Sequence, residues 1–409
     1  MINETYLKNF LKYISFDTQS DESSDTCPST AKQRLLGEAL VEELHNLGID
    51  NAFIDQDGYV YGVLEANVKT NGAVGLIAHM DTSDEASGKD VKPQIIHNYD
   101  GRIIEVNKEL GIILDPKVFP VMKTNIGHTI ITTDGTTLLG ADDKSGVAII
   151  MTTIEEIIKE NLPHPTIMIT FTPDEEIGRG ADRFNVKYYH EHNCYLAYTI
   201  DGGSYNVIEY ENFNAASCKV TITGKSIHPG SAKDKMINSQ ILAMEFFNKL
   251  PELMRPEHTE GYEGFNHLTE INGTTSKTVM HFIIRNHDMV KFNEQKDLFN
   301  QIALELNNKY GEKLFNVEIK DSYYNMKEKV ALHPEVLSRA VEAFKDNGIE
   351  PTFEAIRGGT DGARLSFEGI TTPNLGTGGQ NYHGPFEYVD VNEASIMVKV
   401  LKTLVQKYQ

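Results

Sequence analysis

The stretch Leu138-Leu139-Gly140-Ala141-Asp142-Asp143-Lys144-Ser145-Gly146 places two adjacent carboxylates where an apolar run gives way to a predicted helix. The aspartate pair therefore lies at a strand-to-helix corner, and such corners gather ligands at the carboxyl ends of parallel strands. An Asp that only caps the helix start explains the same pattern, and the pair alone favours that interpretation. The helix is predicted because apolar residues recur at three- and four-residue spacing. These are Val147, Ile150, Met151, Ile154, Ile157 and Ile158.

Three further apolar, strand-like runs each end in polar residues that can bind a metal ion. The runs are residues 73–78, 166–172 and 196–200, and they are followed by His79 and Asp81, by Glu175 and Glu176, and by Asp201. Continuous apolar runs are typical of strands buried on both faces of a parallel sheet. Any one of these polar groups fits a solvated turn or a strand end equally well. Their repeated placement after separate strands, together with Asp142, indicates a metal site.

Neighbouring side chains at these corners can divide the work of a metal-dependent reaction. Strand periodicity points His79 and Asp81 the same way, so the carboxylate can orient the imidazole and raise the basicity of its coordinating nitrogen. Glu175 and Glu176 diverge, so one can hold a cation while the other takes a proton from a cation-bound water as general base. The spacing leaves open which glutamate has which role.

The composition is that of an ordinary globular protein with two or three domains. The chain has 409 residues, of which 40% are hydrophobic and 24% charged. A formal net charge of −21 argues against nucleic acid and anionic membranes as partners. No signal-like N-terminus and no run of ~18 apolar residues is present, so we expect a cytoplasmic protein. The 3 cysteines are widely separated and predict neither a disulfide framework nor a cysteine metal site.

These corners and several later motifs resemble the M20 family of di-zinc metallopeptidases, and in particular its tripeptide aminopeptidases. The resemblance covers essentially the whole chain in order, and no motif position departs from the family pattern. The matching motifs are His79-Met80-Asp81-Thr82, Leu139-Gly140-Ala141-Asp142-Asp143-Lys144, Thr172-Pro173-Asp174-Glu175-Glu176, Thr199-Ile200-Asp201-Gly202-Gly203, Ser226-Ile227-His228-Pro229-Gly230, Arg357-Gly358-Gly359-Thr360-Asp361-Gly362 and Asn381-Tyr382-His383-Gly384.

The resemblance implies two zinc ions per chain, bridged by a shared carboxylate and by a water or hydroxide, with Co²⁺ or Mn²⁺ as substitutes. The ligands would be His79 and Asp201 for one ion, Glu176 and His383 for the other, and Asp142 for both. Asp81 would orient His79, and Glu175 would be the general base. A cis peptide between Asp142 and Asp143 is implied as well. Two Zn²⁺ would balance three carboxylates and a hydroxide, which gives a neutral centre that can be partly buried.

The pattern after residue 211 predicts a second domain. The expected elements follow the order βαββαβ, at residues 215–223, 238–250, 268–273, 278–286, 291–310 and 316–324. This order suits a small open-faced α+β lid inserted into a larger domain. We therefore expect an α/β fold with a lid at residues 212–321. The catalytic domain would be discontinuous, residues 1–211 and 322–409, with a mostly parallel sheet flanked by helices, and His383 would return from its second part to the metals.

Three basic residues are candidates for substrate binding on the strength of the resemblance. His228 lies in a predicted lid loop, Arg285 at a lid strand end, and Arg357 before a Gly-Gly turn of the catalytic domain. A guanidinium can bind a substrate carboxylate through two hydrogen bonds. Surface or ion-pair roles are the plainer alternatives. Family members resemble a clamshell in which a His of the lid domain reaches the scissile carbonyl oxygen, sometimes across a dimer interface. The resemblance therefore allows a homodimer through the lid.

The resemblance implies an aminopeptidase that hydrolyses the N-terminal residue from tripeptides. A zinc-bridging hydroxide would attack the carbonyl, zinc would polarise it, and Glu175 would move the proton. A relative that cleaves dipeptides or N-acyl amino acids would need the same metals and would differ only in its pocket. A metal-dependent binding protein without turnover is a third alternative, against which the intact Glu175 argues. The expected partners are small peptides.

Overall fold

The computed structural model describes residues 2–70, 72–311 and 313–409, which form two compact units. Unit 1 comprises Met1–Tyr210, Met326–Glu354 and Thr360–Gln409, and unit 2 comprises Glu211–Asn325 and Ala355–Gly359. The segment predicted as a lid, residues 212–321, falls within unit 2. Each unit therefore joins segments that are far apart in the sequence, and each has a hydrophobic core of its own.

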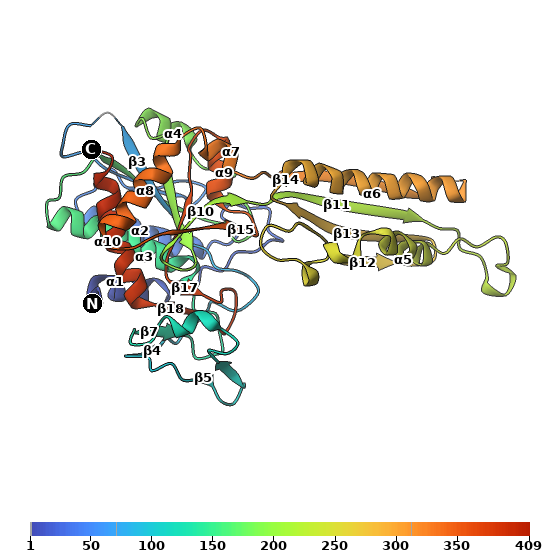
Figure 1. The fold of residues 1–409 in the computed structure, drawn as a ribbon, viewed down its shortest axis with the longest axis horizontal. Coiled ribbons are helices and arrows are strands. Elements are labelled where there is room, and N and C mark those ends of the chain that lie inside the picture. The colour runs from blue at the N-terminus through green and yellow to red at the C-terminus, as the bar shows by residue number, and fades with distance from the viewer. Residues whose placement is uncertain (1, 71, 312) are drawn as a thin grey trace. The chain divides into compact units, whose positions relative to one another are not determined.

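Unit 1 is built on an eight-stranded sheet with the order β1-β2-β8-β3-β9-β16-β10-β15 (Figure 1). In that order the strands are Phe53–Ile54, Val60–Leu64, Thr166–Thr172, Ala73–His79, Ala197–Gly202, Asn374–Gly376, Val207–Asn212 and Thr352–Ile356. The neighbours β8, β3, β9 and β16 pair in parallel, whereas β1, β2 and β10 pair antiparallel. All seven residues of β3 are buried, which explains its continuous apolar sequence.

Helices pack on this sheet, as the sequence predicts. They are α1 (Glu4–Tyr13), α2 (Gln33–Asn46), α3 (Ala141–Lys159), α4 (Val186–Glu191), α7 (Lys327–Val330), α8 (Pro334–Asp346), α9 (Asp361–Phe367) and α10 (Val391–Gln406). α3 contacts β3 and β9, and α1 and α10 pack on α3. Ile77 of β3 lies in a separate cluster with Tyr189 of α4 and Leu365 of α9. The predicted class, a mostly parallel sheet flanked by helices, is confirmed.

Gly146 lets the first turns of α3 approach the sheet closely. A Cβ at this position would lie 1.8 Å from the backbone oxygen of Ile200 in β9, so no larger residue fits. The start of α3 is therefore held directly against the carboxyl-terminal part of β9. This contact brings Asp142 and Asp201 to the same corner of unit 1.

Two smaller sheets extend unit 1. One has the order β17-β18-β7-β4, with strands Gly379–Gln380, Tyr388–Asp390, Ile130–Thr132 and Gln94–Ile96, and the other pairs β5 (Ile104–Asn107) with β6 (Ile112–Leu114), near the 3₁₀ helix η1 (Pro120–Lys123). Leu114, Met122 and Tyr388 are buried together in their core. The turn between β17 and β18 contains His383.

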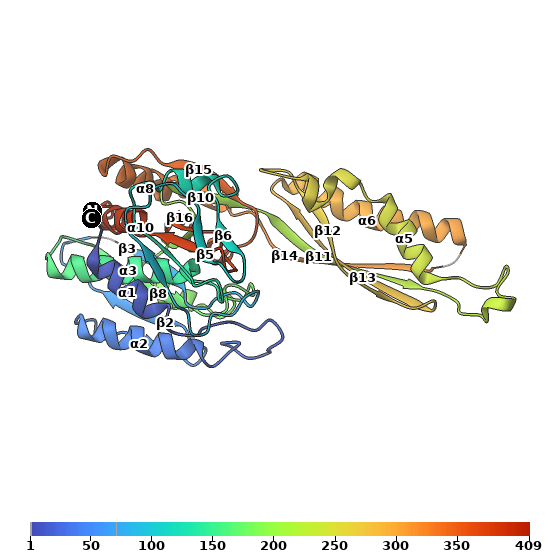
Figure 2. The same ribbon diagram turned by 90° about the horizontal axis from the view of Figure 1, so that it is seen from below.

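Unit 2 has the predicted βαββαβ order. Its elements are β11 (Asn214–Thr223), α5 (Ser239–Lys249), β12 (Phe265–Gly273), β13 (Lys277–Asn286), α6 (Met289–Tyr310) and β14 (Phe315–Tyr323), with 3₁₀ turns η2 (Pro229–Ser231), η3 (Glu252–Met254) and η4 (Pro256–His258). The sheet order is β12-β13-β11-β14, and all its pairs are antiparallel. Figure 2 shows α5 and α6 on one face of this sheet, where Phe246, Phe282 and Phe299 pack in one core.

Candidate metal centre

The polar residues predicted as a site meet at one edge of the large sheet. β3 ends at His79, β8 leads to Glu175 and Glu176, and β9 contains Asp201 near its end. β8, β3 and β9 are neighbouring parallel strands, so their carboxyl ends lie side by side. α3 begins beside this edge and adds Asp142.

The imidazole of His79 is surrounded by carboxylates. Its Nε2 is 2.8 Å from Asp142 Oδ1, 3.5 Å from Asp201 Oδ1 and 4.0 Å from Glu175 Oε2. Its side chain is only 2% exposed. Two groups of ligand atoms, His79 with Asp142 and Glu176 and His79 with Glu175 and Asp201, each lie within 4.8 Å of one another.

His383 reaches the same edge from the turn between β17 and β18. Its Nε2 lies 2.9 Å from Glu176 Oε2 and 3.6 Å from Asp142 Oδ2. One oxygen of Asp142 therefore faces His79, and the other faces His383. This geometry suits a carboxylate shared between two cations. All seven residues predicted for the metal centre are brought together, namely His79, Asp81, Asp142, Glu175, Glu176, Asp201 and His383.

Asp81 is fully buried and supports both halves of the site. The Nδ1 atom of His79 lies 3.0 Å from the backbone oxygen of Asp81 and 3.4 Å from its Oδ1. The same carboxylate accepts the backbone N–H groups of Glu175 at 2.9 Å and Glu176 at 3.2 Å. Asp81 thus fixes the His79 imidazole relative to the turn that carries Glu175 and Glu176, which we call the glutamate corner.

Glu387 is a supporting residue that the sequence analysis missed. Its buried carboxylate accepts the backbone N–H groups of Leu139 at 2.6 Å, Gly140 at 2.8 Å and Asp142 at 3.1 Å. It therefore holds the turn that presents the aspartate pair. No local pattern reveals this role, because Glu387 lies about 245 positions away from its partners. The peptide bond between Asp142 and Asp143 is cis, as the resemblance implies.

The glutamate corner is also held from other directions. The Asp174 carboxylate accepts hydrogen bonds from the Ser29 backbone N–H at 2.7 Å and from Gln33 Nε2 at 2.7 Å. Asp361, at the start of α9, accepts a bond from Thr172 Oγ1 at 2.8 Å. Glu175 and Glu176 therefore project from a segment whose backbone has little freedom.

The pKa values of the groups at the centre are shifted in the direction that favours a bound cation. Burial raises the pKa of Glu176 to about 7 and that of Asp201 to about 6, and neighbouring carboxylates add to both shifts. Hydrogen bonds to Asp142 and Glu176 raise the pKa of His383 to about 11. Burial also raises the pKa of Glu175 well above its usual range, and Asp201 adds to that rise.

These donor atoms fit a divalent metal centre. Imidazole nitrogens and carboxylate oxygens are the usual ligands of zinc and related ions. Asp142 and Asp201 face histidine nitrogens and each other. Their remaining lone pairs are open to a cation. The structure therefore contains groups of residues suited to metal binding, while the individual ligand roles stay predictions.

The three predicted substrate-binding residues all lie in unit 2, and their role stays a prediction. His228 is exposed and accepts a hydrogen bond from the Gly230 N–H at 3.1 Å. Arg285 Nη1 donates to the Ile284 backbone oxygen at 3.1 Å, and its guanidinium lies over the Tyr323 ring. Arg357 belongs to the segment Ala355–Gly359.

Placing Arg357 in the catalytic domain was wrong, because it belongs to the same compact unit as Arg285. Its Nη1 donates to the backbone oxygens of Gly261 at 2.6 Å and Glu263 at 3.0 Å. Its guanidinium also lies 5.2 Å from the Phe213 ring centroid. These contacts with distant segments tie residue 357 to unit 2, and no local sequence pattern reveals them.

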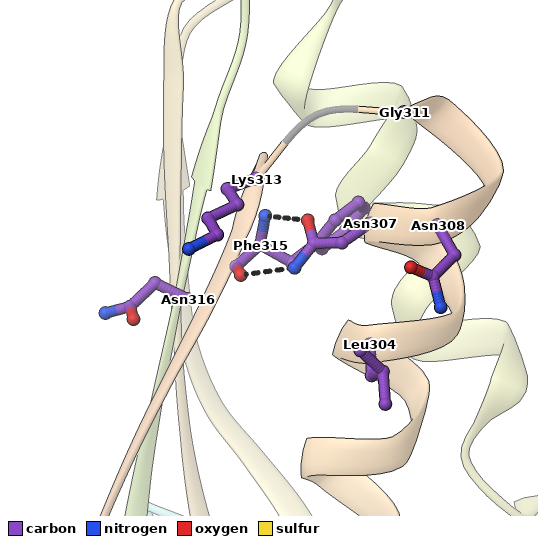
Figure 3. Close-up of a pocket in the computed structure, with 7 residues that line it drawn as sticks. All are labelled: Leu304, Asn307, Asn308, Gly311, Lys313, Phe315 and Asn316. Carbon is purple, nitrogen blue, oxygen red and sulfur yellow. Dashed lines mark hydrogen bonds between the residues drawn. The ribbon is translucent and has the colours of Figure 1, made fainter.

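The pocket in Figure 3 lies in unit 2. It is lined by residues near the end of α6 and the start of β14, and Asn307 there exchanges hydrogen bonds with the Phe315 backbone. None of its lining residues is a predicted site residue. Among its described lining residues, Lys313 alone is charged.

Comparison with known proteins decides the family. The chain is 52% identical to the peptidase T of Caldanaerobacter subterraneus over 404 residues, which is 98% of each chain. The chain belongs to the peptidase T family. Residues 210–313 also match the peptidase dimerisation domain of M20 peptidases. The predictions of this family and of a peptidase are confirmed.

Solved structures of the peptidase T fold agree with the architecture. The aminopeptidase PepT from Bacillus cereus aligns with a TM-score of 0.78 at 21% identity, covering 100% of this chain and 99% of that one. A tripeptidase from Staphylococcus aureus gives the same score, identity and coverage. Among the residues that the structure describes, no helix is long and apolar enough to cross a membrane.

Proposed function

We propose that this member of the peptidase T family is a two-zinc aminopeptidase that releases the N-terminal residue of tripeptides. The decisive observation is the position of Asp142, one oxygen of which faces His79 while the other faces His383. His79 in turn lies beside Asp201, and His383 lies beside Glu176. Glu175 lies beside this arrangement with its carboxylate 4.0 Å from His79 Nε2. The tripeptidase with the same fold supports the choice of substrate.

The ligand set follows from the geometry and the resemblance together. His79 and Asp201 would hold one ion, Glu176 and His383 the other, and Asp142 would hold both. Bound divalent ions would supply a water of lowered pKa and polarise the scissile carbonyl. Co²⁺ and Mn²⁺ suit the same imidazole and carboxylate donors, so they are expected substitutes.

Glu175 is the group suited to proton transfer. Its side chain is 17% exposed, so it faces the site while remaining largely buried. Burial raises its pKa well above the usual carboxylate value, which favours a group that accepts a proton and then donates it to the leaving amine. Asp81 fixes the Glu175 backbone, so the carboxylate starts from a defined position.

The lid function is assigned to residues 212–321, with residues 1–211 and 322–409 as the catalytic domain apart from the segment Ala355–Gly359, which belongs to unit 2. In this proposal His228, Arg285 and Arg357 bind the substrate, and the free carboxylate of a tripeptide pairs with an arginine. The match to a dimerisation domain supports a homodimer through this domain. The expected setting is the cytoplasm, with small peptides as partners.

The general base assignment can be tested with Glu175→Gln. This substitution removes the base without removing a predicted ligand, so kcat should fall by ~10²- to 10⁴-fold while two metal ions per chain remain. Elemental analysis and steady-state kinetics on the same preparation measure both quantities. Near-normal turnover with full metal content would show that Glu175 is not the base.

Substrate class is tested by mass spectrometry of products from di-, tri- and tetrapeptides and from N-acetylated amino acids. The proposal predicts release of the N-terminal residue from tripeptides as the preferred reaction. Preferred cleavage of dipeptides or N-acyl amino acids would assign the chain to a different activity with the same metals.

A further inference from the structure

Glu209 is a carboxylate near the metal centre that the proposed reaction leaves unused. It lies on β10 and pairs in register with Asn374 of β16, which pairs in register with Thr199 of β9. Directly opposed residues share a face of a sheet, so Thr199, Asn374 and Glu209 form a polar row across three strands. Asp201, a predicted metal ligand, follows Thr199 on β9, at a register shift in its pairing with β16.

Asn374 orients the middle of this row. Thr199 Oγ1 donates to Asn374 Oδ1, and Thr360 Oγ1 donates to the same oxygen at 3.1 Å. With its oxygen occupied, the amide directs its nitrogen toward Glu209, and Nδ2 lies 3.4 Å from Glu209 Oε2. Within the described part of the chain, this long hydrogen bond is the only one that Glu209 makes.

Gly202 lets this carboxylate approach the metal-binding end of β9. A Cβ at position 202 would lie 3.2 Å from Glu209 Oε2, closer than ordinary van der Waals contact. The carboxylate of Glu209 is thus packed against the residue that directly follows Asp201. This contact places a negative charge next to the predicted ligand set.

The other supporting carboxylates near the centre are already satisfied by donors. Asp81, Asp143 and Glu387 accept hydrogen bonds from backbone N–H groups. Asp174 accepts hydrogen bonds from Ser29 and Gln33, and Asp361 accepts one from Thr172. Glu209 is partly buried and has no ion-pair partner among the described residues. Burial raises its pKa to about 7, with Asp201 and Glu354 adding to the rise. Such a carboxylate is costly unless a cation pairs with it.

We propose that Glu209 binds the α-ammonium group of the peptide substrate. The inference rests on the proposed function, because an aminopeptidase must recognise a free amino terminus. An ammonium would form a charge-assisted hydrogen bond with this carboxylate, whose other contact is the Asn374 amide. A peptide with a blocked or missing amine would leave Glu209 unpaired, and this penalty gives specificity for a free N-terminus.

The test uses the metal-loaded enzyme and two ligands that differ by one amino group, trialanine and propionyl-alanyl-alanine. Glu209→Gln keeps the shape and the Asn374 contact but removes the charge. We expect kcat/KM for trialanine to fall roughly 30-fold or more, mainly through KM, while the inhibition constant of the propionyl compound changes less than about twofold. Two metal ions per chain should remain.

Glu350→Gln is the matched control, because Glu350 is an exposed carboxylate just before β15 that pairs with Lys345 at 3.2 Å. It should leave both constants unchanged, and Glu209→Asp should recover part of the trialanine activity. Equal weakening of both ligands, or loss of a metal ion from Glu209→Gln, would overturn the proposal. Failure of the unmutated enzyme to release alanine from trialanine would instead refute the proposed function.

Discussion

Two clusters in unit 1 bring a histidine and carboxylates within 4.8 Å of one another, and they differ in how their oxygens are satisfied. In the cluster around His79, Asp142 and Asp201 face histidine nitrogens and each other. The second cluster consists of His128, Asp390 and Glu393. Its carboxylates accept hydrogen bonds from Asn125 Nδ2, at 2.8 Å for Asp390 and 3.1 Å for Glu393. Asp390 also caps α10 by accepting two backbone N–H groups.

The difference shows that residue types alone do not define a metal site. A carboxylate whose lone pairs are filled by amide donors is stable as an anion without a metal, and here Asp390 serves as a helix cap. A carboxylate that faces other carboxylates and imidazoles needs a cation. The His79 cluster is therefore built for metals, whereas the His128 cluster is built to join β7, β18 and α10.

The largest expected effect comes from removing the shared ligand of the first cluster. Asp142→Ala removes the residue predicted to bind both ions, so we expect loss of bound metal and a fall of activity to background. Metal content per chain, measured after gel filtration, and kcat on a tripeptide check this outcome. His383→Ala should lose less metal, since His383 is predicted to bind one ion only.

Asp390→Ala provides the matched comparison in the second cluster. It also removes a buried aspartate next to a histidine, yet it should leave two metals bound and kcat unchanged at temperatures where the protein is folded. If Asp390→Ala released metal while Asp142→Ala did not, the assignment of the two clusters would have to be reversed.

Much of the first cluster could be predicted from sequence because its residues follow recognisable strands. The apolar runs before His79, Glu175 and Asp201 identify neighbouring parallel strands, and the ends of such strands must share an edge. His383 is different, since it lies on a turn with a left-handed φ of 65°, and only the resemblance pointed to it.

What could not be predicted depends on contacts between distant segments. Glu387 holds the turn before Asp142 through three backbone N–H groups, and Glu209 meets Asn374 across a strand pair. Arg357 was assigned to the wrong unit because its carbonyl partners lie about 95 positions earlier in the chain. Each of these partners is fixed by tertiary packing, and no periodic pattern in the sequence records it.

Asp390→Ala should also lower stability, which sharpens the structural assignment of the second cluster. It removes the cap of α10 and leaves His128 and Asn125 without their shared acceptor. A lost cap costs about 1–2 kcal/mol and unpaired donors cost more, so we expect about 3 kcal/mol less free energy of unfolding. Urea denaturation measures it. Asn238→Ala, at the cap of α5 in unit 2, is the control and should cost about 1 kcal/mol.

The smallest effect concerns the pH dependence that Glu393 gives to the second cluster. Burial raises the pKa of Glu393 to about 8, from the ordinary 4.5, and Asp390 adds to the rise. Between pH 4.5 and pH 8, the folded protein therefore keeps a proton on Glu393 that the unfolded chain has lost. The stability that this group contributes falls as the pH rises through this range, and it is constant above pH 8. A tenfold difference in proton affinity between the folded and unfolded states corresponds to about 1.4 kcal/mol.

Glu393→Gln removes this titration while keeping an oxygen for Asn125. Relative to the unmutated protein, the variant should gain about 2 kcal/mol in free energy of unfolding between pH 5 and pH 6.5. Denaturation curves at both pH values, with metals bound, give the difference. A difference that stays constant with pH would mean that Glu393 is ionised throughout. The second cluster would then hold two buried negative charges, and the contrast with the first cluster would no longer rest on satisfied carboxylates.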